Sequence, residues 1–462
     1  MLPLRASLRF AALAALALTA LVLPRPAPAA AAVAQSPALI ETRLVDLANA
    51  SRAERGLGPM RVDVRMIPDA RAWSYGMAQR GQIGHEPNLR SHVPRQASAT
   101  SENVGMSNAE DAASHLHQML MGSAPHREAV LDGRWTDVAV GVVVSGGRAW
   151  MTQRFTAGAP AAVHWGVPAT AAAARRDFVG HGASLAVVVR DDAFPDALAA
   201  GPLAGDRGPL LFTPHGEVPH PAVRLALEET LQPGATIYVV GGHAAVSQGV
   251  EDELRGAGWE VERLDGGDRF ATSAAVARAV VERTGRHDLA MLASGEDWPD
   301  AAAAGAFGAQ SGVPVLLTEH GAVPAPTAIV LDDLDFDRIV ALGGSAALTD
   351  GVVLGAGAER IAGPDRMATS GSVARILWGV WEAGDVRGWT LVPAGGDGWL
   401  YALGAAPGAA RRDTPVLLVG DPLSDGIRDY LSGLEHGQTG VPISTHGPVP
   451  AAAVEAVRAL AG

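Results

Sequence analysis

Apolar residues are spaced differently in the two parts of this chain, and the spacing changes near residue 158. In the first part, Ile40 and Leu44 recur at a helical interval, and similar stretches over 68–81 and 108–121 predict two more helices. The polar segment 82–107 is rich in turn residues, which predicts loops. This part therefore begins as a set of helices joined by irregular chain.

Two strands are predicted to follow. The third helix is expected to end at 122–127, where glycine, serine and proline cluster. Residues 137–144 and 149–155 are rich in apolar residues, which predicts strands, and Ser145-Gly146-Gly147 between them is a typical hairpin turn. Three helices and a hairpin predict a compact α+β domain over 35–157.

The second part contains short runs that are apolar throughout rather than alternating. Residues 185–189, 237–240 and 339–342 are such runs, and alanine-rich helical stretches separate them. This pattern predicts buried parallel strands in βα repeats. No GxGxxG follows the first strand of any repeat, which argues against a dinucleotide site.

The second part also repeats itself with a period near 100 residues. The segment 194–201 recurs at 298–305 and, in altered form, at 399–406. A Gly-Asp-Arg-Phe-Ala-Thr-Ser segment at 267–273 recurs in similar form at 363–370, whereas the first unit keeps only Ala169-Thr170-Ala171. Three units are therefore predicted, the first degenerate at its start and the third degenerate as a whole: 163–263, 264–360 and 361–462.

The first 34 residues have the features of a secretory signal peptide. Arg5 and Arg9 precede an apolar run over 10–23, and small residues lead to an expected cleavage site after Ala34. The alternative is a retained membrane anchor, although the run is shorter than the roughly 20 residues that a spanning helix needs. We expect a secreted protein that has no membrane partner after cleavage.

Composition and charge exclude several functions. The 462 residues suffice for two to four domains. The absence of cysteine excludes disulfides and thiolate-ligated metals, and all 36 basic residues are arginine, which excludes a Schiff-base lysine. Residues 158–462 carry 20 arginines and 37 acidic residues, so this part has no electrostatic reason to bind nucleic acid. The charge changes at 158–162, which we interpret as a linker.

Four motifs in the first part occur in the order and spacing of a known family. They are Ser101-Glu102-Asn103, the Ser-Ala-Pro-His-Arg segment at 123–127, the strand 138–142 and the Thr-Gln-Arg-Phe segment at 152–155. With these motifs the domain resembles a bacterial CAP domain of the SCP/PR1 type. The resemblance implies an α-β-α sandwich with a surface cleft occupied by His85, Glu102 and His126.

Three roles remain open for these cleft residues. Imidazole and carboxylate groups can bind zinc, calcium or magnesium without thiolates. They can also serve as a general acid and base if burial shifts their pKa values. The third alternative is that they only hold loops together through hydrogen bonds.

The chain also departs from the family pattern. Leu120 stands where a tryptophan is common, Ala124-Pro125 replaces Pro-Gly, and Ala129 replaces an asparagine. A fourth cleft acid has no clear counterpart, and Asp132 and Asp137 are the candidates.

The repeats resemble a second family. The Gly-Asp-Arg-Phe-Ala-Thr segment, the Pro-Asp-Ala-Leu helix start at 195–198 and the Val-Val-Gly-Gly turn at 239–242 together resemble cell wall binding repeat type 2. The resemblance implies three α/β units around a pseudo-threefold axis, docked non-covalently on an anionic wall polymer or glycan. An acidic protein does not attract a polyanion by its average field, so local arginines, bridging divalent ions or neutral sugar contacts are needed.

Arg269 and Arg366 are the candidates for polymer contact. Their alternative role is an ion pair with Asp268, with Asp365 or with an acid of a neighbouring unit.

The expected protein is therefore an α+β CAP sandwich followed by three parallel-sheet repeats, secreted and associated with the cell wall. In the first hypothesis the repeats dock the chain and the CAP cleft binds an unidentified ligand or a divalent metal. In the second, the protein is a hydrolase that acts on an envelope substrate through that cleft, although no Ser-His-Asp spacing or HExxH motif supports it. In the third, the repeats act as a spacer or self-associate.

Overall fold

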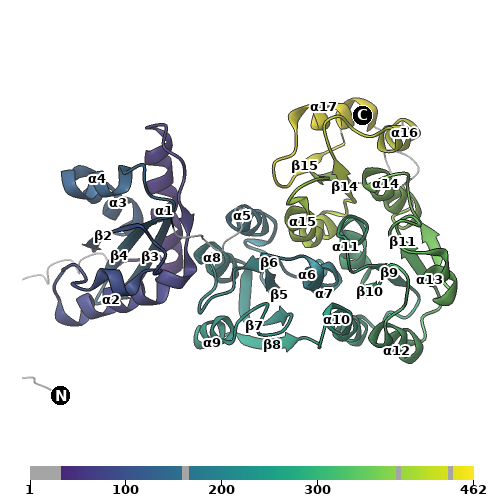
Figure 1. Ribbon diagram of the computed structural model, residues 1–462, viewed down its shortest axis with the longest axis horizontal. Helices are drawn as coiled ribbons and strands as arrows, with labels where there is room; N and C mark the ends of the chain where they lie inside the picture. Colours follow the sequence, from purple (N-terminus) through teal and green to yellow (C-terminus); the bar gives the residue numbers. More distant parts are fainter. Residues whose placement is uncertain (1–32, 159–165, 381–386, 435–440, 462) are drawn as a thin grey trace, which may run out of the picture.

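A computed structural model describes residues 33–158, 166–380, 387–434 and 441–461. The expected signal peptide up to Ala32 and linker residues 159–162 lie outside these ranges. Within them, no helix is both long enough and apolar enough to cross a bilayer. Figure 1 shows an N-terminal domain beside a larger body made of three α/β units.

The N-terminal domain is built around a four-stranded sheet with the order β1-β3-β4-β2. Strands β2, β4 and β3 are antiparallel, and the short β1 pairs parallel with β3. The bounds are β1 (Arg61–Val62), β2 (Ala99–Ser107), β3 (Asp137–Ser145), β4 (Arg148–Ala157), α1 (Pro37–Ala53), α2 (Ile67–Arg80), α3 (Ala112–Gly122) and α4 (Ala124–Leu131), with 3-10 turns at Val64–Met66 and Leu89–His92.

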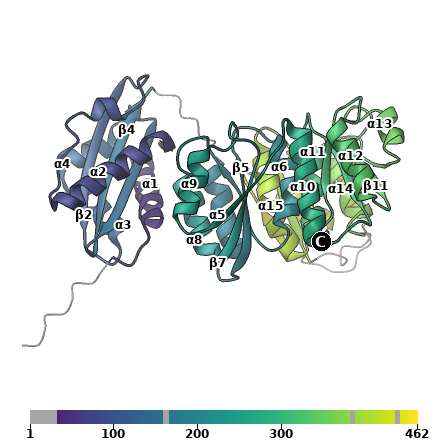
Figure 2. The same cartoon turned by 90° about the horizontal axis from the view of Figure 1, so that it is seen from below.

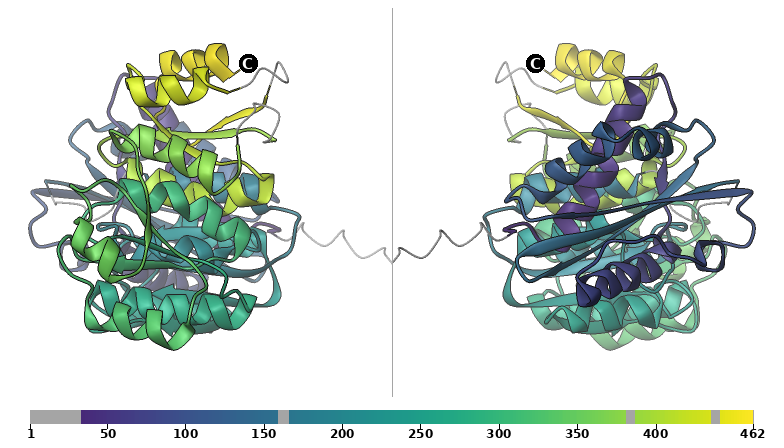
Figure 3. Two further views of the ribbon diagram at one scale, coloured as in Figure 1. Left: turned by 90° about the vertical axis from the view of Figure 1, so that its right-hand side faces the viewer. Right: turned by 90° about the vertical axis from the view of Figure 1, so that its left-hand side faces the viewer.

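Helices cover both faces of this sheet, which confirms the predicted α-β-α sandwich. Helix α2 lies on one face, and α1 with α3 and α4 covers the other (Figures 1 and 3). Helix α2 crosses β3 so closely that a side chain at Gly141 would collide with the backbone of Arg71. The packing therefore requires the glycine within this apolar strand.

One local prediction in this domain is wrong: the segment predicted as loop contains β2, whose nine residues pair with β4 along their whole length. The third helix ends at Gly122, within the predicted segment, but the sequence did not predict the helix α4 that starts directly after it, with Pro125 in its first turn. Proline is tolerated there because the first-turn N–H groups have no partner within the helix.

The second part contains three separate parallel sheets, with the orders β6-β5-β7-β8, β10-β9-β11-β12 and β14-β13-β15. The first sheet has β5 (Ala183–Arg190), β6 (Leu210–Thr213), β7 (Leu231–Val240) and β8 (Glu260–Leu264). The second has β9 (Ala290–Ser294), β10 (Val315–Thr318), β11 (Ile339–Leu342) and β12 (Glu359–Ile361). The third has β13 (Trp389–Pro393), β14 (Val416–Val419) and β15 (Ile443–Thr445).

Helices surround these sheets, and we call the chain around each sheet the first, second and third unit. The first unit has α5 (Val167–Phe178), α6 (Pro195–Leu198), α7 (Ala200–Ala204), α8 (Pro221–Thr230) and α9 (Gln248–Gly256). The second has α10 (Arg269–Thr284), α11 (Pro299–Ser311), α12 (Ala325–Leu334) and α13 (Asp350–Gly355). The third has α14 (Arg366–Ile376), α15 (Gly398–Arg412), α16 (Asp425–Ser432) and α17 (Ala451–Ala461).

One helix from each unit packs at the centre of this body: α7, α11 and α15 (Figure 1). The helices approach closely because their contact positions are small. A Cβ built on Gly201 would lie 3.2 Å from the carbonyl oxygen of Gly305, and one built on Gly305 would lie 3.6 Å from Cβ of Ala406. These three residues occupy equivalent positions, which confirms the expected pseudo-threefold arrangement. The exact limits predicted for the units stay predictions.

The N-terminal domain packs directly on the first unit (Figure 2). Helix α1 contacts α8, and Val218 from the loop before α8 joins the apolar core of the N-terminal domain. Arg71 Nη1 donates to Glu253 Oε1 at 3.0 Å, and Arg224 Nη1 donates to the same oxygen at 3.1 Å. Apolar burial and the ion pair between Arg71 and Glu253 both join the two parts.

Candidate functional site

The fold brings together the three predicted cleft residues from separate elements. Strand β2 carries Glu102, the loop after α2 carries His85, and the first turn of α4 carries His126. His85 Nδ1 lies 3.1 Å from Glu102 Oε1, and the two imidazole rings are 6.5 Å apart between centroids. Asn103 donates to the backbone carbonyl of His126 at 3.2 Å, which ties α4 to β2. Residues distant in sequence therefore form one polar cluster.

The carboxylate of this cluster is buried and held by an arginine that the sequence analysis missed. Glu102 has a side chain only 2% exposed, and Arg154, directly opposite on β4, is fully buried. Arg154 Nε donates to Glu102 Oε2 at 3.3 Å, and the backbone N–H of Glu86 donates to Oε1 at 2.9 Å. In the sequence, the indication of this role was a single arginine within the predicted strand 149–155.

This geometry favours a polar binding surface over a metal centre. Both oxygens of Glu102 already accept hydrogen bonds, and a divalent ion there would lie beside the positive Arg154. Among the described residues, no three His, Asp or Glu side chains are grouped to hold a metal. These contacts do not support a metal role for His85, Glu102 and His126. That role therefore stays a prediction.

Neither candidate for a fourth acid is free to join the cluster. Asp132 pairs with Arg134 at 2.6 Å, and hydrogen bonds from Arg134 are the main cause of its lowered pKa. Asp137 is fully buried, accepts a hydrogen bond from Thr136 and pairs with Arg61. Of the cleft side chains, His85 is the most accessible to a ligand, because its side chain is 58% exposed.

Arg269 and Arg366 begin α10 and α14, and each is exposed where two units meet. Arg269 Nη1 donates to the carbonyl of Gly295 at 2.6 Å, and Arg366 Nη1 donates to that of Ala394 at 3.3 Å. Each arginine is thus anchored at the carboxyl end of a central strand. This position suits a ligand that lies across the junction between units.

The acidic residues near these arginines were the basis of their alternative role, an ion pair. Asp268 and Asp365 accept backbone N–H groups as N-caps of the two helices. Arg366 lies 3.7 Å from Asp297 of the second unit, which is an acid of a neighbouring unit. Its guanidinium also lies 5.8 Å from the ring centre of Trp298.

Each arginine shares its junction with a half-buried aspartate that the sequence analysis did not single out. Asp196 interacts electrostatically with Arg269 where the first and second units meet, and we call this junction the first cleft. The second cleft is a pocket between the second and third units that contains Asp300 and Arg366. Burial raises the pKa of both aspartates, and nearby arginines partly oppose this effect. In the sequence, the feature that could have identified these aspartates is the Pro-Asp pair that recurs at the starts of α6 and α11.

A glycine in a tight turn lies close to the carboxylate of each of these aspartates. Gly241 follows β7 with a φ of 104°, and Gly343 follows β11 with a φ of 100°, a region that favours glycine. A Cβ built on Gly241 would lie 2.6 Å from Asp196 Oδ2, and a Cβ built on Gly343 would lie even closer to Asp300 Oδ2. The recurring Gly-Gly turns therefore shape the two clefts.

The third cleft, between the third and first units, has different chemistry. Tyr401 takes the position of the aspartate, next to the positive-φ Gly447, and the buried Val167 begins α5 where the other units have an arginine. His446 lines this cleft, and burial together with nearby arginines lowers its pKa to about 4. The degenerate start of the first unit and the degenerate helix of the third unit therefore lie in the same cleft.

Comparisons with known families support this two-part architecture. Residues 45–155 match the family model of the cysteine-rich secretory protein family (CAP), and residues 168–251 and 263–353 match cell wall binding domain 2 (CWB2). The third sheet lies beyond the matched residues.

Individual proteins give a similar result over part of the chain. An N-acetylmuramoyl-L-alanine amidase of Bacillus subtilis is 27% identical over 253 residues, which cover 54% of this chain and 48% of the amidase. Cwp8 and Cwp6 from Clostridium difficile match with TM-scores of 0.55 and 0.56 and identities of 25% and 19%. Each match covers 63% of this chain, and 50% and 46% of those chains respectively. The chain thus spans about half the length of these relatives.

Proposed function

Because the chain carries a CAP domain followed by cell wall binding domain 2 units, we propose that it is an exported protein held non-covalently at the cell wall. The units dock on an anionic wall polymer or glycan, and the CAP domain presents its cleft to an envelope ligand. The relationship to a Bacillus subtilis amidase whose name refers to a wall component supports this location. The observation that carries the proposal is the repeated pairing of an exposed arginine with a half-buried aspartate in the first and second clefts.

The two clefts resolve the charge conflict of an acidic protein on an acidic polymer. Each holds one exposed guanidinium, available to an anionic group, and one half-buried carboxylate near it. The carboxylate accepts hydrogen bonds from neutral sugar hydroxyls, so it does not have to face the charge of the polymer. Local contacts therefore replace attraction by the average field.

The test is sedimentation of the full chain with purified cell walls, using Arg269→Gln and Arg366→Gln. We expect each substitution to weaken binding about tenfold, since a hydrogen bond to a charged group contributes about 1.5–3 kcal/mol. Arg286→Gln is the matched control, because Arg286 is exposed and pairs with Asp288 on the surface. Binding should fall with added salt.

Three results would contradict this docking scheme. If the unaltered chain stays in solution, the units do not bind these walls. If EDTA releases the chain and neither arginine matters, divalent ions bridge the acidic surface instead. If Arg286→Gln has the same effect as the cleft variants, the clefts have no special role.

A second candidate function is hydrolysis of an envelope substrate by the cluster of His85, Glu102 and His126, which the fold brings together. His126→Ala is the appropriate test, because Glu102→Ala would leave the buried Arg154 without a counter-charge and would disturb the fold. Loss of wall hydrolysis in His126→Ala, with docking unchanged, would support a catalytic role. Hydrolysis that persists at the unaltered rate would remove His126 from the mechanism.

A further inference from the structure

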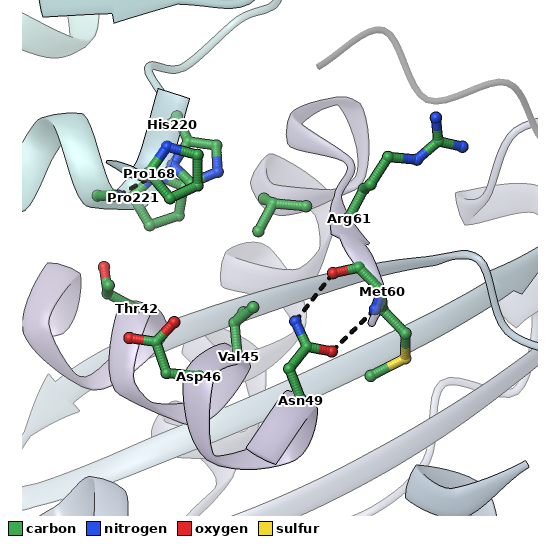
Figure 4. Close-up of a pocket in the computed structure, with 11 residues that line it drawn as sticks. Thr42, Val45, Asp46, Asn49, Met60, Arg61, Pro168, His220 and Pro221 are labelled. Atoms are coloured by element: carbon green, nitrogen blue, oxygen red, sulfur yellow. Dashed lines mark hydrogen bonds between the residues drawn. The ribbon is translucent and has the colours of Figure 1, made fainter. Parts of the chain in front are cut away.

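A pocket lies between the N-terminal domain and the first unit, away from all the clefts described above. Thr42 and Asp46 on α1 line one side, and His220, Pro221 and Pro168 of the first unit line the other (Figure 4). Its volume is about 160 Å³. A cavity needs only about 10–15 Å³ to hold one water, so this pocket accommodates a small organic group.

The chemistry of the pocket is set by a buried histidine. His220 is only 3% exposed, and its Nδ1 accepts the N–H of Ala222 at 3.1 Å, which caps α8. Burial lowers the pKa of His220 to about 3, so the ring is neutral near pH 7. Because Nδ1 is an acceptor, the proton of the neutral ring is on Nε2. Within the described residues, this buried Nε2–H donor has no hydrogen-bond partner.

The opposite side of the pocket supplies an acceptor. Asp46 presents its carboxylate there, and the hydroxyl of Thr42 also lacks a hydrogen-bond partner among the residues that the structure describes. Asn49 contributes no free group, because it exchanges two hydrogen bonds with the backbone of Met60. Much of the remaining lining is apolar: Val45, Met60, Val62, Pro168, Pro221 and Ala222.

We propose that this interdomain pocket binds an acetamido group, that is, a trans secondary amide with a small acyl methyl. The C=O and N–H of a trans amide point in opposite directions. The carbonyl therefore accepts from His220 while the N–H donates to Asp46 across the pocket, and the methyl packs on apolar lining such as Val45 and Pro221.

Other ligand classes match these groups less well. A carboxylate would be repelled by Asp46, and Arg61, the cation that also lines the pocket, is already paired with Asp137. An ammonium group cannot accept from the Nε2–H of His220, and an apolar molecule would satisfy neither group. The acetamido group can come from an N-acetylated sugar or from an acylated peptide. Because both domains supply walls, its binding also strengthens the contact between them.

The test uses the full chain with histidine labelled in ¹⁵N, titrated with N-acetylglucosamine or N-acetyl-alaninamide and observed by NMR. We expect a saturable shift of the His220 Nε2–H signal with at least one of these probes. Glucose, which lacks the amide, should cause none. The probe with the higher affinity identifies the source, a sugar or a peptide.

Variants then tie binding to the pocket. His220→Asn keeps a side-chain acceptor for the cap of α8, but the shorter side chain places no donor at the position of Nε2. Probe affinity, followed by ligand-observed NMR, should therefore fall about tenfold. His181→Asn is the matched control, because His181 is exposed in the same unit. If His220→Asn does not fold, Asp46→Ala on the exposed side of the pocket should weaken binding of the same probes.

The proposal is wrong under any of three results. Neither acetamido probe shifts His220 at saturating concentration, glucose shifts it equally, or the folded variant that is tested binds as well as the unaltered chain. In each case ordered water alone satisfies the buried donor. Wall sedimentation plays no part in this test, so its failure is separate from failure of the docking proposal.

Discussion

The ion pair between Glu102 and Arg154 allows a quantitative prediction about the CAP domain. Arg154 is fully buried and donates to Glu102 through one nitrogen at 3.3 Å, while its Nη1 donates to the carbonyl of His92 at 3.4 Å. Its Nη2 has no partner among the described residues. Glu102→Gln therefore leaves a buried guanidinium without a counter-charge, and we expect a loss of about 3–5 kcal/mol in the free energy of unfolding.

The reverse substitution should cost less. In Arg154→Met the carboxylate of Glu102 keeps the N–H of Glu86 and its contact with His85. The double variant Glu102→Gln/Arg154→Met removes both charges, so it should recover most of the loss of Glu102→Gln. Breaking one partner of a buried pair is costly, whereas replacing both by groups of similar volume is often close to neutral.

Urea unfolding of the four proteins, analysed as a double-mutant cycle, measures this coupling. The N-terminal transition must be followed separately, for example through ¹⁵N-labelled His85, because the domains can unfold independently. Glu110→Gln, at an exposed position of the same domain, is the control. A loss below about 1 kcal/mol for Glu102→Gln, or a double variant no more stable than the sum of the single losses predicts, would refute the reasoning.

Three further predictions concern stability and are checked by urea unfolding. Because the pKa of His220 is lowered to about 3, the unfolded chain binds a proton below about pH 6.5 that the folded chain does not bind. The free energy of unfolding should therefore fall by about 1.4 kcal/mol for each pH unit below about pH 6.5, and His220→Asn should reduce this slope. Gly141→Ala should cost about 3 kcal/mol or more because its Cβ meets the backbone of α2, whereas Gly58→Ala, with open space around it, should change little. Glu253→Gln should cost less than about 1 kcal/mol, with an effect that shrinks in salt, because both its ion pairs are partly exposed.

The third cleft gives a physical meaning to the degenerate repeats. The first unit lacks the arginine at the start of α5, and the third unit lacks the aspartate at the start of α15. In a cyclic arrangement these two positions face each other, so one cleft loses both partners while two clefts remain complete. Apparently separate losses in sequence thus affect a single site.

The architecture of this protein is largely predictable from its sequence. The period near 100 residues predicted three similar units, uniformly apolar runs such as 185–189 predicted parallel strands, and four short motifs identified the CAP resemblance. These features depend on local periodicity and on spacing along the chain, so they are visible without coordinates. The same motifs also nominated His85, Glu102 and His126, which the fold brings together.

Which charged and polar side chains act together depends on the tertiary structure. Strand β2 was missed because its polar residues are stabilised by pairing with β4, a partner about 50 residues away. Arg154 and Asp196 gained their roles from burial beside charges on other elements, and His220 from the meeting of two domains. Burial and long-range pairing fix the environment of a charge, and neither property is encoded in the neighbours of a residue along the chain.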